Sequence, residues 1–302
     1  MTMNAAQTGR PVVAGVDGSE SALEAVRWAA REAHRRQVPL RLVSAFGWTT
    51  GHHVGDPGLG TDYLAVLLQK ARDEVAAAAV AASGVAAELA IEQEVVTGFP
   101  VPVLNAEAAR AQLVVLGDRG LGGFTGLLVG SVAVALATHA PCPVVVVRGS
   151  TPDASPPLEG PVVVGIDGSP TSEAALAFAF EAAELRGVPL VAVHTWTDYQ
   201  IESTMVAVLE GDAIDADEHR LLAERLAGWS EKFPDVSVRR LVTRYRPART
   251  LIEQSGHAQL VVVGSRGRGG FAGMLLGSVS HALLHHAACP VAVVRPATAH
   301  TQ

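Results

Sequence analysis

Two glycine-rich segments with nearly the same sequence are the residues of this chain best suited to hold a ligand. The first, GDRGLGGFTGLLVGS, begins at Gly117, and the second, GSRGRGGFAGMLLGS, begins at Gly264. Each follows an apolar run typical of a buried strand and leads into a pattern typical of a helix. Because glycine is entropically costly to order, this density indicates a backbone that bends sharply or lies close to a ligand.

The spacing within these segments favours a phosphate-binding loop. Both contain Gly, two residues, Gly, nine residues and then Gly-Ser. Main-chain N–H groups at a loop-to-helix junction point toward an anion, and the helix dipole adds attraction. Neither segment ends in the Gly-Lys-Ser/Thr of a P-loop, and neither follows the first strand of its half, as the dinucleotide fingerprint requires. A plain turn followed by a helix-capping serine is the alternative interpretation.

An aspartate follows the first apolar run of each half. PVVAGVDGSE and PVVVGIDGSP place Asp17 and Asp167 directly after an expected strand. Ligands of parallel sheets bind outside the carboxyl ends of the strands, so each aspartate should face a glycine-rich loop if the first and fourth strands are neighbours. Alone, each aspartate also fits a helix N-cap, although Ser19 and Ser169 are equally placed to cap.

These motifs belong to an internal repeat. Residues 117–148 match residues 264–295 at 21 of 32 positions, and GSTPDASPPLEG, rich in Gly, Ser and Pro, lies between the copies. Such a composition is typical of a linker. We therefore expect one domain at 11–148, a linker at 149–160 and a second domain at 161–296.

Each half alternates strand-length apolar runs with helical patterns, which predicts an α/β fold with a parallel sheet covered by helices on both faces. In the first copy we predict strands at 12–16, 38–46, 87–96, 112–117 and 143–147. We predict helices at 20–36, 101–110 and 131–139, and a further helix that ends at 82. The second copy has its strands near 162–166, 190–196, 236–243, 260–264 and 291–295.

Composition and charge argue weakly against several classes of partner, although a local basic patch stays open. A net charge of -7 argues against nucleic acid and anionic membrane as main partners. No apolar run approaches the ~18 residues that span a bilayer, and no secretory signal is visible.

Cys142 and Cys289 occupy matching positions and are predicted to be buried residues of a cytoplasmic protein. We expect no catalytic residues and no metal site, since no nucleophile elbow or repeated carboxylate pair is present, and His281 and His285 lack a third ligand.

Together these residues resemble the universal stress protein family. The resemblance rests on VDGS and IDGS after the first strands, the two glycine loops and the Cys-Pro-Val starts of the fifth strands. It implies two tandem doubly wound five-stranded parallel sheets, Rossmann-like and similar to the adenine nucleotide alpha hydrolases, with strand order 3-2-1-4-5. Family members with this glycine motif bind ATP, which implies one ATP, with Mg²⁺, in each half.

The resemblance also implies which residues meet the nucleotide. The aspartates would meet the adenosine, the second-strand residues would face adenine, and the loops with the following helix start would hold phosphate and ribose. The first set is Gly15, Asp17, Ala45, Gly117, Gly120, Gly122, Gly123, Gly130, Ser131 and Val132; the second is Gly165, Asp167, Thr195, Gly264, Gly267, Gly269, Gly270, Gly277, Ser278 and Val279. Independently of the resemblance, Arg119 and Arg266 in the loops are expected to add positive charge beside the phosphates.

Two details of these sets carry expectations of their own. Asp118 in the first loop corresponds to Ser265 in the second, and an acid beside a triphosphate repels it unless the acid points away or meets Mg²⁺, so the two sites should differ in affinity. A methyl group at Gly117 or Gly264 is expected to weaken phosphate binding while sparing the fold.

The expected function is a cytoplasmic ATP-binding regulator of stress response or growth arrest, with at most slow hydrolysis. A slow ATPase or a nucleotidyl or phosphoryl transferase on the same fold is the alternative, because fold alone excludes neither. A bound nucleotide with a purely structural role is a third possibility. The apolar fifth strand would be an exposed edge, so we expect the two copies to pair through it as an internal pseudo-dimer, and the resemblance adds a homodimer of the whole chain.

Overall fold

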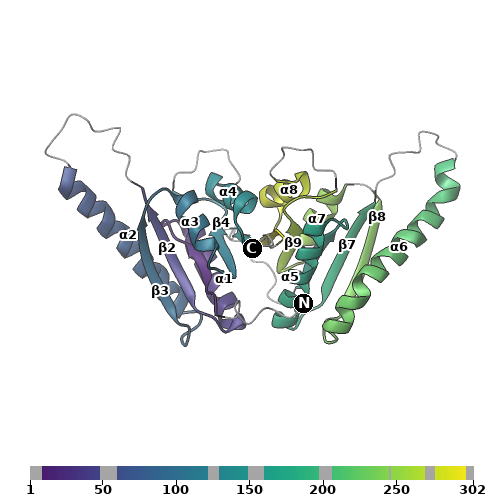
Figure 1. Cartoon of the computed structure of the whole chain (residues 1–302), viewed down its shortest axis with the longest axis horizontal. Coiled ribbons are helices and arrows are strands. Elements are labelled where there is room, and N and C mark those ends of the chain that lie inside the picture. Colours follow the sequence, from purple (N-terminus) through teal and green to yellow (C-terminus); the bar gives the residue numbers. More distant parts are fainter. Residues whose placement is uncertain are drawn as a thin grey trace, which may run out of the picture. The chain divides into compact units, whose positions relative to one another are not determined.

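The computed structural model describes residues 9–47, 60–121, 129–148, 160–196, 206–244, 246–268 and 276–296, with the side chains of 60–64 and 206–215 outside that description. The described residues form two compact units, one before residue 149 and one from residue 160 to 296. Each unit is a twisted parallel sheet with helices packed against it (Figure 1).

The first unit has five parallel strands in the order β3-β2-β1-β4-β5. Helices α1 and α2 pack together against the sheet, while α3 and α4 pack together on its other face. The elements are β1 (Val12–Gly15), α1 (Glu20–Arg36), β2 (Leu40–Phe46), α2 (Gly60–Ser83), β3 (Ile91–Thr97), α3 (Pro100–Ala108), β4 (Leu113–Gly117), α4 (Ser131–His139) and β5 (Val144–Val147).

The second unit repeats this order as β8-β7-β6-β9-β10, so the expected 3-2-1-4-5 arrangement is confirmed in both halves. Helix α5 takes the place of α1, and α7 packs against α8 as α3 does against α4. The elements are β6 (Val162–Ile166), α5 (Pro170–Arg186), β7 (Leu190–Trp196), α6 (Val206–Lys232), β8 (Val238–Arg244), α7 (Pro247–Ser255), β9 (Leu260–Gly264), α8 (Ser278–His286) and β10 (Val291–Val294).

Local sequence explains where these elements lie. The central strands are short valine-rich runs buried on both faces, as parallel strands between two helix layers must be. The Ser19 and Ser169 hydroxyls cap α1 and α5, each accepting a hydrogen bond of 3.2 Å from the amide three residues on. No helix within the described residues is both long enough and apolar enough to cross a membrane.

The two cysteines lie at matching places before β5 and β10. Both are buried and unpaired. Burial raises the pKa of the Cys142 thiol and of the Cys289 thiol to about 12. Since the thiolate is the reactive form, these side chains serve as packing residues.

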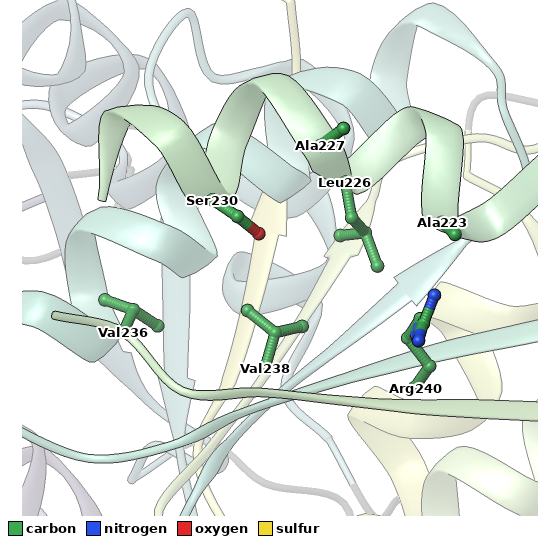
Figure 2. A pocket seen from close by; sticks show the side chains of 7 residues that line it. All are labelled: Ala223, Leu226, Ala227, Ser230, Val236, Val238 and Arg240. Carbon is green, nitrogen blue, oxygen red and sulfur yellow. The ribbon is translucent and has the colours of Figure 1, made fainter. Parts of the chain in front are cut away.

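A hollow of about 270 Å³ lies between α6 and β8 in the second unit (Figure 2). Because β8 begins at Val238, the hollow opens near the amino end of that strand. None of the candidate ligand-binding residues lines it. Its lining residues are Ala223, Leu226, Ala227, Ser230, Val236, Val238 and Arg240.

The first glycine of each glycine-rich segment is required by helix packing. A Cβ at Gly117 would lie 2.7 Å from main-chain atoms of Ser21 in α1, and a Cβ at Gly264 would lie 2.8 Å from those of Thr171 in α5. Main-chain atoms cannot move aside as the end of a flexible side chain can. The expectation that alanine at these positions spares the fold is therefore wrong.

Alanine at Gly117 or at Gly264 should lower the free energy of unfolding by roughly 1–3 kcal/mol, because the added methyl group pushes the helix away from the strand end. Urea unfolding of the full chain, followed by circular dichroism, measures this change. Gly228→Ala is the matched control: a methyl group on this exposed glycine of α6 would have no neighbour within 4 Å, and helix propensity predicts a gain of about 0.5–1 kcal/mol. Unchanged midpoints in both test variants would contradict the packing role.

Candidate functional site

The candidate residues gather at the carboxyl end of each sheet. In the first unit, β1 ends at Gly15 and its neighbour β4 ends at Gly117, so Asp17 and the glycine-rich loop lie at the same edge. The second unit places Asp167 and the loop after Gly264 in the same way. This edge is also where the strand order reverses, the usual ligand position in doubly wound sheets.

Asp17 joins the start of α1 to the glycine-rich loop. Its Oδ1 accepts hydrogen bonds from the amide and hydroxyl of Ser19, at 3.0 and 2.6 Å. Its Oδ2 accepts one from the Leu121 amide, at 3.0 Å. Ser19, rather than Asp17, is the helix cap, which leaves the aspartate to hold the first residues of the loop in place.

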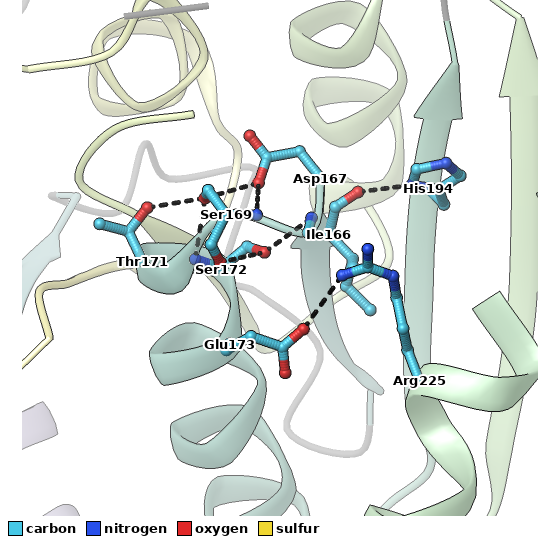
Figure 3. A network of polar contacts seen from close by, with 9 residues as sticks. Ile166, Asp167, Ser169, Thr171, Ser172, Glu173, His194 and Arg225 are labelled. Carbon is cyan, nitrogen blue, oxygen red and sulfur yellow. Dashed lines mark hydrogen bonds and ion pairs between the residues drawn. The ribbon is translucent and has the colours of Figure 1, made fainter. Parts of the chain in front are cut away.

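Asp167 repeats this arrangement in the second unit (Figure 3). Its Oδ1 accepts from the amide and hydroxyl of Ser169, at 2.9 and 2.7 Å, and its Oδ2 accepts from the Arg268 amide at 2.9 Å. Burial raises the pKa of Asp167, but the hydrogen bonds, led by the Ser169 hydroxyl, outweigh burial and hold the pKa below its ordinary value.

The second glycine of each motif makes this contact possible. A Cβ at Gly120 would overlap Oδ2 of Asp17, and a Cβ at Gly267 would lie 2.5 Å from Oδ2 of Asp167. Any side chain there would push the carboxylate off the loop. Contact with the aspartate therefore accounts for glycine at this position, whether or not the loop also holds a ligand.

The glycine-rich loops end at helices whose first turn has no side-chain cap. The N-cap residues of α4 and α8 are Gly130 and Gly277, which make no side-chain hydrogen bond to the helix. Ser131 and Ser278 are the first helical residues and are exposed, so the alternative of a capping serine is wrong. The Gly130 amide donates to the Asp118 carbonyl at 2.7 Å, and Gly277 to Ser265 at 2.8 Å, which closes the base of each loop.

The remaining candidates take other places at this edge. A Cβ at Gly15 would lie 2.6 Å from a terminal methyl group of Leu116, and one at Gly165 would lie 3.0 Å from one of Leu251, so leucine side chains pack directly against both glycines. Ala45 and Thr195 are half-buried near the ends of β2 and β7, and Val132 and Val279 are half-buried in the first turns of α4 and α8. The other candidate glycines, Gly122, Gly123, Gly269 and Gly270, lie outside the described residues.

The loop residue after the first glycine differs between the halves. Asp118 is buried, and its Oδ1 accepts from the Ser21 hydroxyl at 2.6 Å. Its Oδ2 lies 4.0 Å from Nε of both Arg119 and Arg148. Asp118 therefore faces its own unit's arginines, and within the described part of the chain no group of three acidic, His or Cys side chains is placed to hold a metal ion.

Sequence reasoning missed two residues at this edge, Glu74 of α2 and Arg225 of α6. The Glu74 carboxylate would lie 2.6 Å from a Cβ on Gly18, and the Arg225 guanidinium occupies the same place beside Gly168. Both glycines have positive φ, +82° and +75°. The helices that carry Glu74 and Arg225 share no motif, so only the folded arrangement reveals them.

The free energy of unfolding should decrease at low pH, because the Asp167 carboxylate then takes up a proton. A lowered native pKa means that its carboxylate contributes fully above the unfolded value of about 3.9 and loses this contribution as pH falls through the native pKa. Asp167→Asn should cost roughly 1–3 kcal/mol at pH 7, and the difference from the native chain should shrink below pH 4. Urea midpoints between pH 2.5 and 7 measure this difference. The exposed Asp235→Asn is the control, and a pH-independent difference for Asp167→Asn would contradict the assignment.

Comparisons with known proteins agree with this geometry. The universal stress protein family model matches residues 9–148 and 160–295. A universal stress protein of Mycobacterium tuberculosis is 42% identical over 294 residues, covering 94% of this chain and 96% of the relative. A second from that organism is 40% identical over 299 residues, covering 97% and 99%. A crystal structure of a universal stress protein from Archaeoglobus fulgidus shares the fold, with a TM-score of 0.67 at 19% identity over 96% of this chain and 98% of that one. The chain therefore belongs to the universal stress protein family, with one family domain in each half.

Proposed function

We propose that this protein binds ATP, one molecule in each half, and acts as a cytoplasmic nucleotide-responsive regulator in stress response or growth arrest. The observation that carries the proposal is a repeated arrangement at both sheet edges. An aspartate fixes the start of a glycine-rich loop, and the loop ends at a helix whose first-turn N–H groups have no side-chain cap. Such N–H groups attract phosphate.

The residues of each edge fit a nucleotide in three respects. Ser131 and Ser278 present exposed hydroxyls beside the helix N-termini, where a phosphate oxygen would accept from them. The loop entrances at Gly120 and Gly267 leave no room for a side chain, so the backbone itself would face the ligand. The strand ends at Ala45 and Thr195 offer main-chain groups to an adenine. Mg²⁺ bound with ATP would neutralise part of the phosphate charge.

Assembly is part of the same proposal. The fifth strands β5 and β10 consist of four buried residues each. We propose that they pair within the chain as an internal pseudo-dimer and that whole chains form homodimers. Sedimentation of the full chain tests the second statement, because a single species at the mass of one chain would contradict it.

Protein purified from cells and then denatured should release close to two ATP molecules per chain, as identified by mass spectrometry. If the purified protein retains no nucleotide, titration calorimetry with added ATP and Mg²⁺ should show two binding events per chain. No retained nucleotide together with no binding of added ATP would overturn the proposal. Sustained phosphate release that disappears in Asp17→Ala and Asp167→Ala variants would instead favour the slow ATPase or transferase alternative.

Ser131→Ala and Ser278→Ala should each weaken ATP binding about tenfold or more in their own half, because a hydrogen bond to a charged group is worth about 1.5–3 kcal/mol. The unfolding midpoint should stay the same, since neither hydroxyl caps its helix. Titration calorimetry and urea unfolding make the two measurements. Ser230→Ala is the control: this exposed serine lies on α6 beside the hollow of Figure 2. Equal affinities for all three variants and the native chain would remove the two serines from the site.

A further inference from the structure

Over the described residues, the two candidate sites have the same backbone arrangement but differ in the charged side chains around it. Three positions at the sheet edge carry an acidic or neutral residue in the first half and a neutral or basic residue in the second. They are the residue after the first motif glycine, the loop residue held by the aspartate, and the helix residue beside the Asp-Gly-Ser turn. The pairs are Asp118 and Ser265, Leu121 and Arg268, and Glu74 and Arg225.

In the first half, acidic side chains offset part of the basic charge. The buried carboxylate of Asp118 lies 4.0 Å from Nε of both Arg119 and Arg148, so its single negative charge offsets one of the two positive charges nearest the loop. Glu74 places a second carboxylate over Gly18, and the ammonium group of Lys70, 3.6 Å away, is largely exposed.

In the second half, the same region is basic. Ser265 supplies no charge, and no carboxylate of the described residues lies within ion-pair distance of Arg266 or Arg295. Burial, followed by repulsion from the nearby Arg266, lowers the pKa of Arg295. These two arginines correspond to Arg119 and Arg148, whose charge Asp118 partly offsets in the first half.

Two further arginines lie over the turn of the second half. The guanidinium groups of Arg225 and Arg268 both meet the space beside Gly168 (Figure 3 shows Arg225). Arg225 has an acidic partner, Glu173, with 3.2 Å between Nη1 and Oε1. Arg268 is exposed and forms no ion pair with a described residue, although its main-chain amide bonds Asp167. Even with Glu173 counted, the turn of the second half is more positive than that of the first.

We propose that the two sites differ in selectivity for phosphate charge: both bind ATP, but the second half favours the triphosphate chain of ATP over a single phosphate more strongly than the first half does. This inference rests on the proposed nucleotide-binding function. Affinity for adenosine is expected to be similar in both halves, because the backbone, the aspartate and the motif glycines are the same. Charges within about 10 Å of the phosphates, partly exposed, change affinity for a polyanion by about tenfold each.

Reciprocal exchange of the differing residues tests the proposal in the full chain. One variant gives the first half the residues of the second, Asp118→Ser with Leu121→Arg. The other gives the second half the residues of the first, Ser265→Asp with Arg268→Leu. Titration calorimetry with ATP and separately with AMP, both in EDTA, reports the affinities, and ATP is then repeated with Mg²⁺.

The native chain should show one tight and one weak ATP site in EDTA, with affinities at least tenfold apart, and the two sites should differ less in their affinity for AMP, which carries fewer negative charges. The first variant should show two tight ATP sites and the second variant two weak ones. High salt should weaken the tight ATP site most. Because Ser265 is buried, an aspartate there could disturb folding, so Arg268→Leu alone, an exposed change, is measured as well and should weaken the tight site about tenfold.

The outcomes separate this inference from the function on which it rests. If the native chain binds neither ATP nor AMP, the proposed nucleotide-binding function fails. If it binds both nucleotides at two sites with the same ratio of ATP to AMP affinity, nucleotide binding stands and charge selection is overturned. Charge selection is also overturned if Arg268→Leu and the first variant leave the ATP affinities unchanged.

Discussion

The hydrogen bonds of one aspartate in each half hold the ligand-binding edge together. One oxygen of Asp17 accepts from Ser19 at the start of α1, and the other accepts from the main chain of the loop that follows β4. A single carboxylate thus connects two strand ends and a helix start that are about a hundred residues apart in the chain. Because the carboxylate is charged, these bonds are stronger than those between neutral groups.

Several other residues follow from that contact. The motif glycine next to the carboxylate cannot carry a side chain, since a Cβ would displace the oxygen from the loop. Gly18 and Gly168 adopt positive φ so that the chain turns from the aspartate into the capping serine. Gly117 and Gly264 let the capped helix lie against the end of the fourth strand. The glycines that first indicated a phosphate loop therefore also solve packing problems, and the two roles share one backbone geometry.

Features encoded by short sequence patterns could be predicted, while those set by contacts between distant elements could not. Valine runs, serine caps and the repeat predicted the elements, the strand order came with the family resemblance, and both are confirmed. The reason for Gly117 was missed because it depends on the path of α1 across the strand end, and no local pattern encodes that path. Glu74 and Arg225 were missed because α2 and α6 share no motif, although both bring a side chain to the same turn.

The two halves agree at the residues that set the backbone and differ at residues that carry charge. The aspartates, the first two motif glycines and the capping serines are the same in both copies, and each takes part in the contacts that hold the edge together. Asp118 and Ser265 differ, as do Leu121 and Arg268, at positions where the backbone is held by other groups and the side chain is not needed for the turn. A duplicated domain can change charge at such positions without disturbing the loop. The two sheet edges therefore have the same geometry but different electrostatic fields at a bound phosphate chain. Their functions can differ through this difference in charge, without a difference in fold.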